Sequence, residues 1–472
     1  MKIKTVADVD DLHSRLAGAY TKCRAQWDYD RDLYFMDHYA EWDSPAPGEE
    51  RVMTNKATNV VDITHALLSQ HLPKITARSI TTSPRADKTA DRVEKFVAGA
   101  IYVNDIRLQE HQIAKVIFDQ ALYGRGALFS GWDPGLEGDD DEYSELPLVL
   151  KYVNHQNLYC LPGGHKRDIA QMYAVYRTAE DLEAEWGKRI RVNENGKTRY
   201  AEDTDELVYK DLWWFKGKKV WHAVTAGATW LRRPVVMPYY NALPYTEMAG
   251  LNTTSPELHL RFLGVLYPLR EAISILERWI NQQASIIAAF ADPVTVAEKD
   301  IEVLKEPGSV IRVRLQQGES IRDKYMVFPP TDAGAGVYRS IQMAQQMVDE
   351  GSFSRYAYAN VNPESGPVVQ GMNANDRMRL APFVKNAELA ISAAVQKLLD
   401  CAHAFAESDG KGRKLQVFSE GERSAVAISA KDLKGWLVTV SLSTKLATDE
   451  ARDWAIAANA RQAGLPISDY TL

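Results

Sequence analysis

Long apolar runs and cysteines are scarce in this chain of 472 residues. No segment offers the eighteen or more consecutive apolar residues that a membrane span requires, so we expect no membrane partner. The opening MKIKTVADVDDLHSRL lacks an apolar core of signal-peptide length. Cys23, Cys160 and Cys401 are odd in number and far apart, which is typical of a reducing compartment without a disulfide framework. We therefore expect a soluble protein made in a cytoplasm.

Catalytic signatures are also missing. The chain contains no H-E-x-x-H, no G-x-S-x-G, no G-x-x-x-x-G-K-S/T and no paired C-x-x-C. The sequence therefore predicts no catalytic residues, no metal and no cofactor.

The formal net charge of −7 excludes a mostly basic surface that would bind nucleic acid along its whole extent. Any contact with DNA or RNA must be local.

Two groups of side chains have the chemistry of metal ligands but not the usual spacing. The acidic stretch 133–145 lacks the alternating ligands of an EF-hand, so we favour a solvated surface loop over a cation site. His155, Cys160 and His165 are conceivable zinc ligands, but no fourth ligand follows at a suitable distance. Packing and a turn are the simpler interpretation of these three residues.

Aromatic and basic side chains offer two further alternatives. Trp213, Trp214 and Phe215 are either a platform on which bases stack or the core of a β-meander, and we favour the core. Arg312 and Arg314 alternate along a strand-like run and meet either phosphate or, as we favour, solvent and interface partners.

The first half of the chain has the pattern of an α+β lobe. Apolar residues at steps of three and four predict helices at 7–26, 30–42, 55–72, 85–103 and 109–122. Strands are predicted at 123–133 and 146–164, and a β-meander at 206–233 with a Lys-Gly-Lys turn. A short helix follows Thr178, its N-cap, and ends at Gly187.

The second half begins with a long amphipathic helix. Ser255 is its predicted N-cap, Pro268 a bend, and Asp292-Pro293 its end. On a helical wheel the apolar arc of 269–290 spans roughly 180°, wider than the roughly 100° of a helix that packs on one core. Such a helix needs neighbours on two sides. The arc includes Ile273, Leu276, Trp279, Ile280 and Ile287.

The opposite arc of this helix is polar and mixed in charge. We expect it to meet water or a hydrated ligand, because neutral polar groups and both charge signs occur in it. Its members are Arg270, Ser274, Glu277, Arg278, Asn281, Gln282 and Ser285.

A small β insertion separates this helix from its return. Strands are predicted at 310–315 and 325–330, and a second helix at 335–350 with Val337, Ile341, Ala344 and Val348 on its apolar stripe. The pattern describes a helical hairpin with a β tip.

A loop rich in Asn, Pro and Gly follows at 355–372, and loops of this length are uncommon unless they are functional. A disordered connection is the alternative to the mobile functional loop that we favour. Its candidate residues are Pro363, Glu364, Gly366, Val368, Val369, Gln370 and Gly371.

A helix bent at Pro382 is predicted at 373–406, then a strand pair at 414–420 and 435–442, and a helix at 448–464.

This order of elements resembles a tailed-bacteriophage portal protein, the head-to-tail connector. The resemblance is carried by DQALYGRGALFSGWD, by LKYVNHQNLYCLPGGHKRDIAQMYAVYRTAEDLEAEWG, by LYPLREAISILERWINQQASIIAAFADP and by NANDRMRLAPFVKNAELAISAAVQKLL. It extends over roughly residues 55–472 and rests on architecture and loose patterns, not on an invariant motif.

The resemblance implies a portal-like division of the chain. It assigns 1–254 to the wing, 255–291 to the first stem helix, 292–331 to the clip and 332–354 to the second stem helix. It assigns 355–372 to the tunnel loop, 373–446 to the long wing helix and wing sheet, and 447–472 to the start of a crown that is mostly absent.

The same resemblance implies a function without catalysis. Portal proteins form a ring, usually of twelve subunits, at one capsid vertex of the virion, and double-stranded DNA is packaged and ejected through it. The implied partners are the terminase motor, a head-tail adaptor, and the major capsid and scaffolding proteins. The polar arc of the first stem helix would face the channel, the loop residues would narrow it, and Arg312, Arg314 and Arg322 would form the clip interface.

Two other functions remain open at this point. Another oligomeric virion protein, such as a baseplate or adhesin component, would also associate but would not require a hairpin with a β tip. A DNA-processing hydrolase would need clustered acids or a nucleophile with a base. A closed ring with a through-channel distinguishes the portal function from both.

Overall fold

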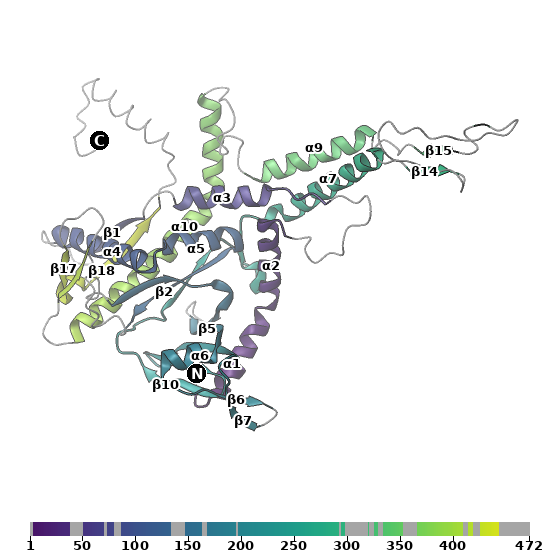
Figure 1. The fold of residues 1–472 in the computed structure, drawn as a ribbon. Helices are drawn as coiled ribbons and strands as arrows, with labels where there is room; N and C mark the ends of the chain where they lie inside the picture. Colours follow the sequence, from purple (N-terminus) through teal and green to yellow (C-terminus); the bar gives the residue numbers. More distant parts are fainter. Residues whose placement is uncertain are drawn as a thin grey trace, which may run out of the picture. The chain divides into compact units, whose positions relative to one another are not determined.

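The computed structural model describes residues 3–37, 51–69, 73–79, 86–133, 147–162, 168–194, 197–291, 294–297, 320, 325–328, 334–352, 366–408, 414–418 and 425–442 (Figure 1). The described chain is a mixture of helices and antiparallel strand pairs, which confirms the α+β class. It divides into two compact units. The first contains Met1–Asp30, Val61–Val265 and Arg377–Leu472, and the second contains Arg31–Val60 and Leu266–Asp376.

The predicted helical start of the chain is confirmed, but the break between the first two helices lies at Tyr20 and not near residue 28 as predicted. The helices are α1 (Val6–Ala19), α2 (Thr21–Phe35), α3 (Lys56–Ser69), α4 (Ala86–Leu108) and α5 (Gln112–Tyr123). Thr5 caps α1, because its side chain accepts a hydrogen bond from the backbone N–H of Asp8 and the Asp8 carboxylate accepts one from Thr5. No helix in the described part of the chain is long and apolar enough to cross a membrane.

A three-stranded sheet in the first unit has the order β11 (Tyr245–Ala249), β2 (Arg125–Trp132), β3 (Leu148–Tyr152). The strand predicted at 123–133 is therefore present. The single strand predicted at 146–164 is wrong, because a 3-10 turn, η2 (His155–Asn157), divides it. The Asn154 side chain accepts a hydrogen bond from the backbone of Gln156, which turns the chain into another sheet.

That second sheet is a five-stranded meander. Its order is β10 (Thr229–Val236), β9 (Lys219–Ala226), β8 (Glu206–Lys216), β5 (Asp168–Thr178) and β4 (Leu158–Pro162). Between β5 and β8 the chain forms α6 (Ala179–Trp186) and the hairpin of β6 (Arg191–Glu194) with β7 (Lys197–Tyr200). Thr178 caps α6 and Gly187 ends it in the left-handed conformation, as predicted.

The main core lies between these sheets and the helices of the first unit. α4, α5 and the long helix α10 (Gly366–Ser408) contribute Phe96, Ile117 and Ile391 to one buried cluster. Trp213 and Trp214 are buried as well, which confirms their role as meander core.

The C-terminal strands pair differently from our prediction. β16 (Lys414–Val417) pairs with β17 (Val426–Ser429), and α11 (Ala430–Leu433) follows. β18 (Trp436–Ser441) pairs with β1 (Lys74–Ser79). The predicted pair of 414–420 with 435–442 is wrong, because each strand has a partner that local pattern did not reveal. The helix predicted at 448–464 lies outside the described residues.

The long amphipathic helix predicted from Ser255 to Ala291 is shorter than expected. α7 spans Arg270–Ala291, and the preceding segment forms 3-10 turns, η3 (Leu258–Leu260) and η4 (Tyr267–Leu269), and the strand pair β12 (Leu251–Asn252) with β13 (Phe262–Leu263). The Ser255 hydroxyl does accept a backbone hydrogen bond, but from Glu257 at 3.2 Å. This bond closes a turn and does not cap a helix, because no helix begins at the residue after Ser255 and η3 starts only at Leu258.

α7 packs against α9 (Gly334–Gly351), and β14 (Val294–Ala297) pairs with β15 (Tyr325–Phe328) between them in the chain (Figure 1). This is the predicted hairpin with a β pair in its connection. The strand at 325–330 is confirmed as β15, but its described partner is β14, which sequence reasoning missed. The strand predicted at 310–315 lies outside the described residues.

The long helix begins earlier than predicted. α10 starts at Gly366, so Gly366, Val368, Val369, Gln370 and Gly371 are helical and the expectation of a loop there is wrong. Pro367 explains the difference, because proline fits the first turn of a helix, where its missing N–H is not needed. Pro382 lies inside α10, as predicted.

Candidate assembly surface

The hairpin of the second unit has a well-packed inner face. Ile273 and Leu276 of α7 are buried, and Ile341, Ala344 and Val348 of α9 are buried too. Trp279 and Ile280 are half-buried. The part of the apolar arc of α7 that faces α9 is therefore buried within the chain.

Another part of the apolar arc is open to solvent. Ile275 is 42% exposed and Ile287 is 58% exposed. On α9, Met343 is 64% exposed and Met347 is 53% exposed. We call these four residues the apolar hairpin surface. Exposed apolar side chains on both helices of one hairpin make it a candidate interaction surface.

The polar arc of α7 is partly covered, which corrects one expectation. Glu277 is 0% exposed, so it does not meet water or a channel in this chain. Its carboxylate accepts hydrogen bonds from the backbone N–H of Thr54 at 2.8 Å and from the Thr54 hydroxyl at 3.0 Å. Asn281 accepts one from the backbone of Val52 at 2.5 Å.

The segment that covers this arc also reaches α9. Lys56 follows Thr54 at the start of α3 and forms an ion pair with Asp349 of α9, 2.9 Å apart. The segment 51–56 thus connects both helices of the hairpin through polar contacts. A polar arc on a helix was visible in the sequence, but its partner, more than 200 residues earlier in the chain, was not.

The exposed part of the polar arc is close to neutral. Arg278 and Gln282 are exposed, together with Glu271 in the first turn. Ser274 and Ser285 are half-buried, as are Arg270 and Asn281. One basic, one acidic and one amide side chain thus face solvent along α7.

The predicted clip arginines and two of the predicted loop residues are not among the described residues. Arg312, Arg314 and Arg322 lie outside the described residues, as do Pro363 and Glu364. The five helical residues at the start of α10 have described backbone only.

The first unit contains a second concentration of functional groups, centred on Arg125. This side chain is 1% exposed, and its guanidinium donates to the Glu247 carboxylate and, at 3.1 Å each, to the carbonyls of His155 and Leu158. Its Cζ lies 5.0 Å from the centre of the Tyr20 ring.

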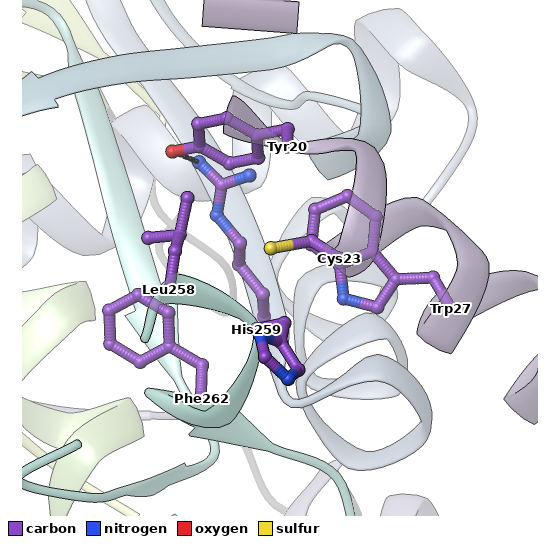
Figure 2. Close-up of a pocket in the computed structure, with 7 residues that line it drawn as sticks. Tyr20, Cys23, Trp27, Leu258, His259 and Phe262 are labelled. Carbon is purple, nitrogen blue, oxygen red and sulfur yellow. Dashed lines mark hydrogen bonds between the residues drawn. The ribbon is translucent and has the colours of Figure 1, made fainter. Parts of the chain in front are cut away.

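Figure 2 shows the surroundings of this site. Tyr20, Cys23 and Trp27 come from the helical N-terminal segment, and Leu258, His259 and Phe262 from the segment before α7. The remaining space is about 10 Å³, room for little more than one water molecule. Because so little space is left for a ligand, we infer that Arg125 has a structural role and holds several segments of the unit together.

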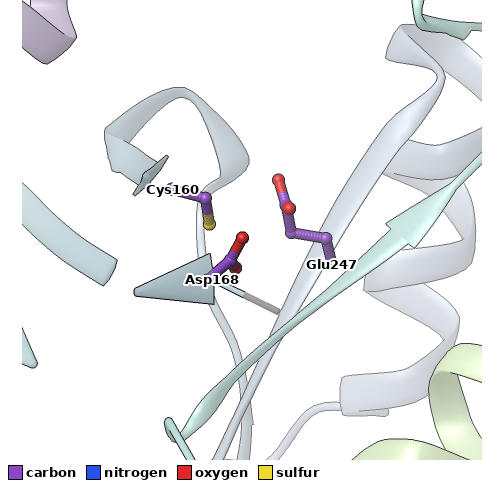
Figure 3. A group of neighbouring side chains, drawn as sticks. All are labelled: Cys160, Asp168 and Glu247. Atoms are coloured by element: carbon purple, nitrogen blue, oxygen red, sulfur yellow. The ribbon is translucent and has the colours of Figure 1, made fainter. Parts of the chain in front are cut away.

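Three potential metal ligands lie next to Arg125. The ligand atoms of Cys160, Asp168 and Glu247 lie within 4.8 Å of one another (Figure 3). Burial raises the pKa of the Cys160 thiol well above its usual value, and a protonated thiol is a poor ligand. Arg125 already pairs with Glu247, so a metal ion would have to displace a cation.

Lys397 adds a second positive charge to this cluster. Its ammonium group donates to the Tyr245 carbonyl at 2.7 Å and to the Thr246 hydroxyl at 2.8 Å. Burial lowers the pKa of Lys397 to about 8 and raises the pKa of Asp168. Two cations beside two carboxylates are typical of a charge-balanced core network.

The zinc alternative from the sequence does not assemble in the described residues. His155 is buried, and its Nδ1 lies 2.8 Å from the Asp119 carboxylate. Cys160 is oriented toward Asp168 and Glu247, and His165 lies outside the described residues. Packing and a turn describe His155 well, because it also contacts the Tyr123 ring and belongs to η2.

Comparison with known proteins adds no family or relative. No protein-family model matches the chain, and no curated protein is significantly similar to it.

Proposed function

We propose that this chain is a portal protein of a tailed bacteriophage, which forms a ring at one capsid vertex through which double-stranded DNA is packaged and ejected. The observation that carries the proposal is the hairpin of α7 and α9 with the β14–β15 pair in its connection and apolar side chains left in solvent. A monomer gains nothing from such a surface, because exposed apolar area is unfavourable in water.

A second copy of the chain is the partner that this surface fits best in the proposal. Exposed apolar residues occur on both helices of one hairpin, so neighbouring hairpins bury them together without any further protein. If each copy uses one patch to contact a different patch of the next, the arrangement closes into a ring when the rotation allows it. The wing and crown assignments follow from this proposal.

The charge of α7 suits a channel through which DNA slides. Each lysine or arginine that neutralises a phosphate strengthens binding through counterion release, so a conduit benefits from few such contacts. Arg278 and Glu271 offset each other among the exposed residues of the helix, and the chain carries a net charge of −7. In the proposed ring Arg278 and Gln282 line the channel, while Glu277 supports the helix from within the subunit.

The remaining assignments extend the same proposal. The connection between α7 and α9, with Arg312, Arg314 and Arg322, would contact the terminase motor or head-tail adaptor. Residues before α10, including Pro363 and Glu364, would narrow the channel. Major capsid and scaffolding proteins would contact the wing, and the assembled ring would reside in the virion after assembly in the host cytoplasm. No catalytic step is part of this function.

Electron microscopy of the purified protein, combined with native mass spectrometry of the same sample, tests the proposal. We expect rings with a central hole wide enough for duplex DNA and a mass near twelve subunits. A homogeneous monomer or dimer would contradict it.

The same sample distinguishes the other functions. An open or channel-free oligomer would favour a baseplate or adhesin component. Cleavage of DNA in the presence of Mg²⁺, lost on substitution of one carboxylate, would favour a DNA-processing hydrolase.

A further inference from the structure

The β6–β7 hairpin of the first unit presents an exposed group of two arginines and a tyrosine. Ile190 precedes β6 and is fully buried in a small core with Leu182 of α6. Its neighbours Arg189 and Arg191 are both exposed, and Tyr200 at the end of β7 is 48% exposed. The buried isoleucine fixes which side of the chain the arginines occupy.

The three exposed side chains contact one another. Arg191 lies directly opposite Tyr200 in the strand pair and donates a hydrogen bond to its hydroxyl at 3.3 Å. The guanidinium carbons of Arg189 and Arg191 lie 4.8 Å and 5.4 Å from the centre of the Tyr200 ring. The Arg191 hydrogen bond, with the charge of both arginines, lowers the pKa of Tyr200. The ring thus orients two positive charges together.

These two arginines lack the carboxylate partners that neighbouring cations have. Arg199 pairs with Asp205 at 2.8 Å, and Arg177 pairs with Glu185. Within the described ranges, no acidic side chain forms an ion pair with Arg189 or Arg191. Their charge is therefore available to an external anion.

The main chain beneath the group is held in place. The backbone N–H of Arg191 donates to the Thr229 hydroxyl at 2.8 Å, and its carbonyl accepts from the N–H of Ala228 at 2.7 Å. The N–H of Ile190 donates to the Glu183 carboxylate at 3.0 Å. Because these bonds attach the hairpin to β10 and α6, little backbone order has to be gained when a partner binds.

We propose that Arg189, Arg191 and Tyr200 form a docking surface for an acidic peptide segment. Guanidinium groups bind carboxylates in a two-pronged geometry, and tyrosine adds a rigid contact area. Glu202 and Asp203 are exposed just after Tyr200. They would repel the long, stiff row of phosphates of a duplex, whereas a short flexible peptide can bend away from them, so the surroundings favour a peptide over nucleic acid. This docking surface goes beyond the proposed portal function and does not depend on it.

The chain itself supplies a suitable probe, because residues 137–145 read EGDDDEYSE. Fluorescence anisotropy with this labelled peptide should show binding to the complete protein that weakens as salt is added. The Arg189→Ala/Arg191→Ala variant should lose at least about tenfold in affinity, since two charge-assisted contacts are removed. A labelled peptide of the same length with Asn and Gln in place of the acids should not bind.

A charge-matched control separates this surface from general electrostatics. Arg15→Ala/Arg233→Ala removes two exposed arginines elsewhere and should change the affinity by less than about twofold. Arg189→Lys/Arg191→Lys retains the charge but not the fork of the guanidinium, and should bind with intermediate affinity. Circular dichroism of each variant checks that it folds.

Three results would overturn the proposal. They are an absence of peptide binding, equal losses in the double variant and its control, and tighter binding of a short DNA duplex that disappears in Arg189→Ala/Arg191→Ala. The last result would identify the surface as a nucleic-acid contact instead.

Discussion

The two compact units differ in the kind of energetically unfavourable side chain that each contains. The first unit holds charged side chains away from water, and the second leaves apolar side chains in water. In the first unit Arg125 is buried and Lys397 is half-buried, and each has polar partners from the same chain. In the second unit Ile275 and Met343 stay in water although apolar burial would stabilise them. The first unit therefore pairs its charged side chains within the chain, while the second unit leaves apolar side chains without a packing partner.

This difference separates stability from assembly. A buried charge that loses its partner raises the free energy of the folded chain directly. An exposed apolar residue contributes little to the isolated chain but contributes to any complex that buries it. Substitutions in the first unit should thus change unfolding, and substitutions on the apolar hairpin surface should change association.

The largest expected effect is on assembly. Ile275→Glu/Met347→Glu places two charges on the apolar hairpin surface, and burying them between copies would be strongly unfavourable. We expect the double variant to lose the high-mass species completely in native mass spectrometry. Its thermal unfolding should remain close to that of the wild type.

Gln282→Glu/Arg278→Gln is the matched control, because it alters exposed positions of the polar arc on the same helix. This variant should still assemble. Equal loss of assembly in both variants would mean that the apolar hairpin surface has no special role.

The next effect tests the first unit. Glu247→Gln removes the carboxylate that pairs with the buried Arg125, and breaking a buried pair typically costs about 3–5 kcal/mol. Denaturant unfolding should show this loss. Glu185→Gln breaks the more exposed pair with Arg177 and should change the unfolding free energy by no more than about 1 kcal/mol. Similar losses in the two variants would argue against a structural role for Arg125.

A close backbone approach in the first unit gives a third prediction. Gly124 ends α5 with φ of 74°, and a side chain there would collide with the backbone of Leu263 and Gly264. Gly187 ends α6 with φ of 61° and faces open space. Gly187→Ala should cost about 1 kcal/mol from backbone strain alone. Gly124→Ala should cost at least about 2 kcal/mol more, because the collision is added. Equal unfolding free energies would show that the approach relaxes easily.

Local signals in the sequence predicted local structure well. Thr178 and Gly187 marked both ends of α6, and apolar spacing identified α7 and α9. These features depend on residues a few positions apart, so a single stretch contains the whole cause. The start of α10 was missed because Gly and Pro are ambiguous, being compatible both with a loop and with the first turn of a helix.

Contacts between distant segments were not predictable in the same way. β1 pairs with β18 across more than 350 residues, and the sequence of neither strand identifies the other as its partner. Arg125 stood unnoticed in a strand-like stretch, because its partners Tyr20, Glu247 and the carbonyl of Leu158 come from separate parts of the chain. A charged residue inside an otherwise apolar strand was the available signal.

The smallest expected effect concerns Lys397 and pH. Burial lowers the pKa of Lys397 in the folded state to about 8, whereas an unfolded lysine titrates near pH 10.4. Between these values the unfolded chain binds more protons, so this lysine makes the folded state more stable as the pH rises. Relative to Lys397→Met, the wild type should gain about 1.5 kcal/mol between pH 8 and pH 9.5. Taking the difference removes the opposing contribution of the buried cysteines, which both proteins share. A difference that stays constant over this range would mean that Lys397 remains fully charged in the folded state, and that the first unit balances its buried charges even more completely than its geometry indicates.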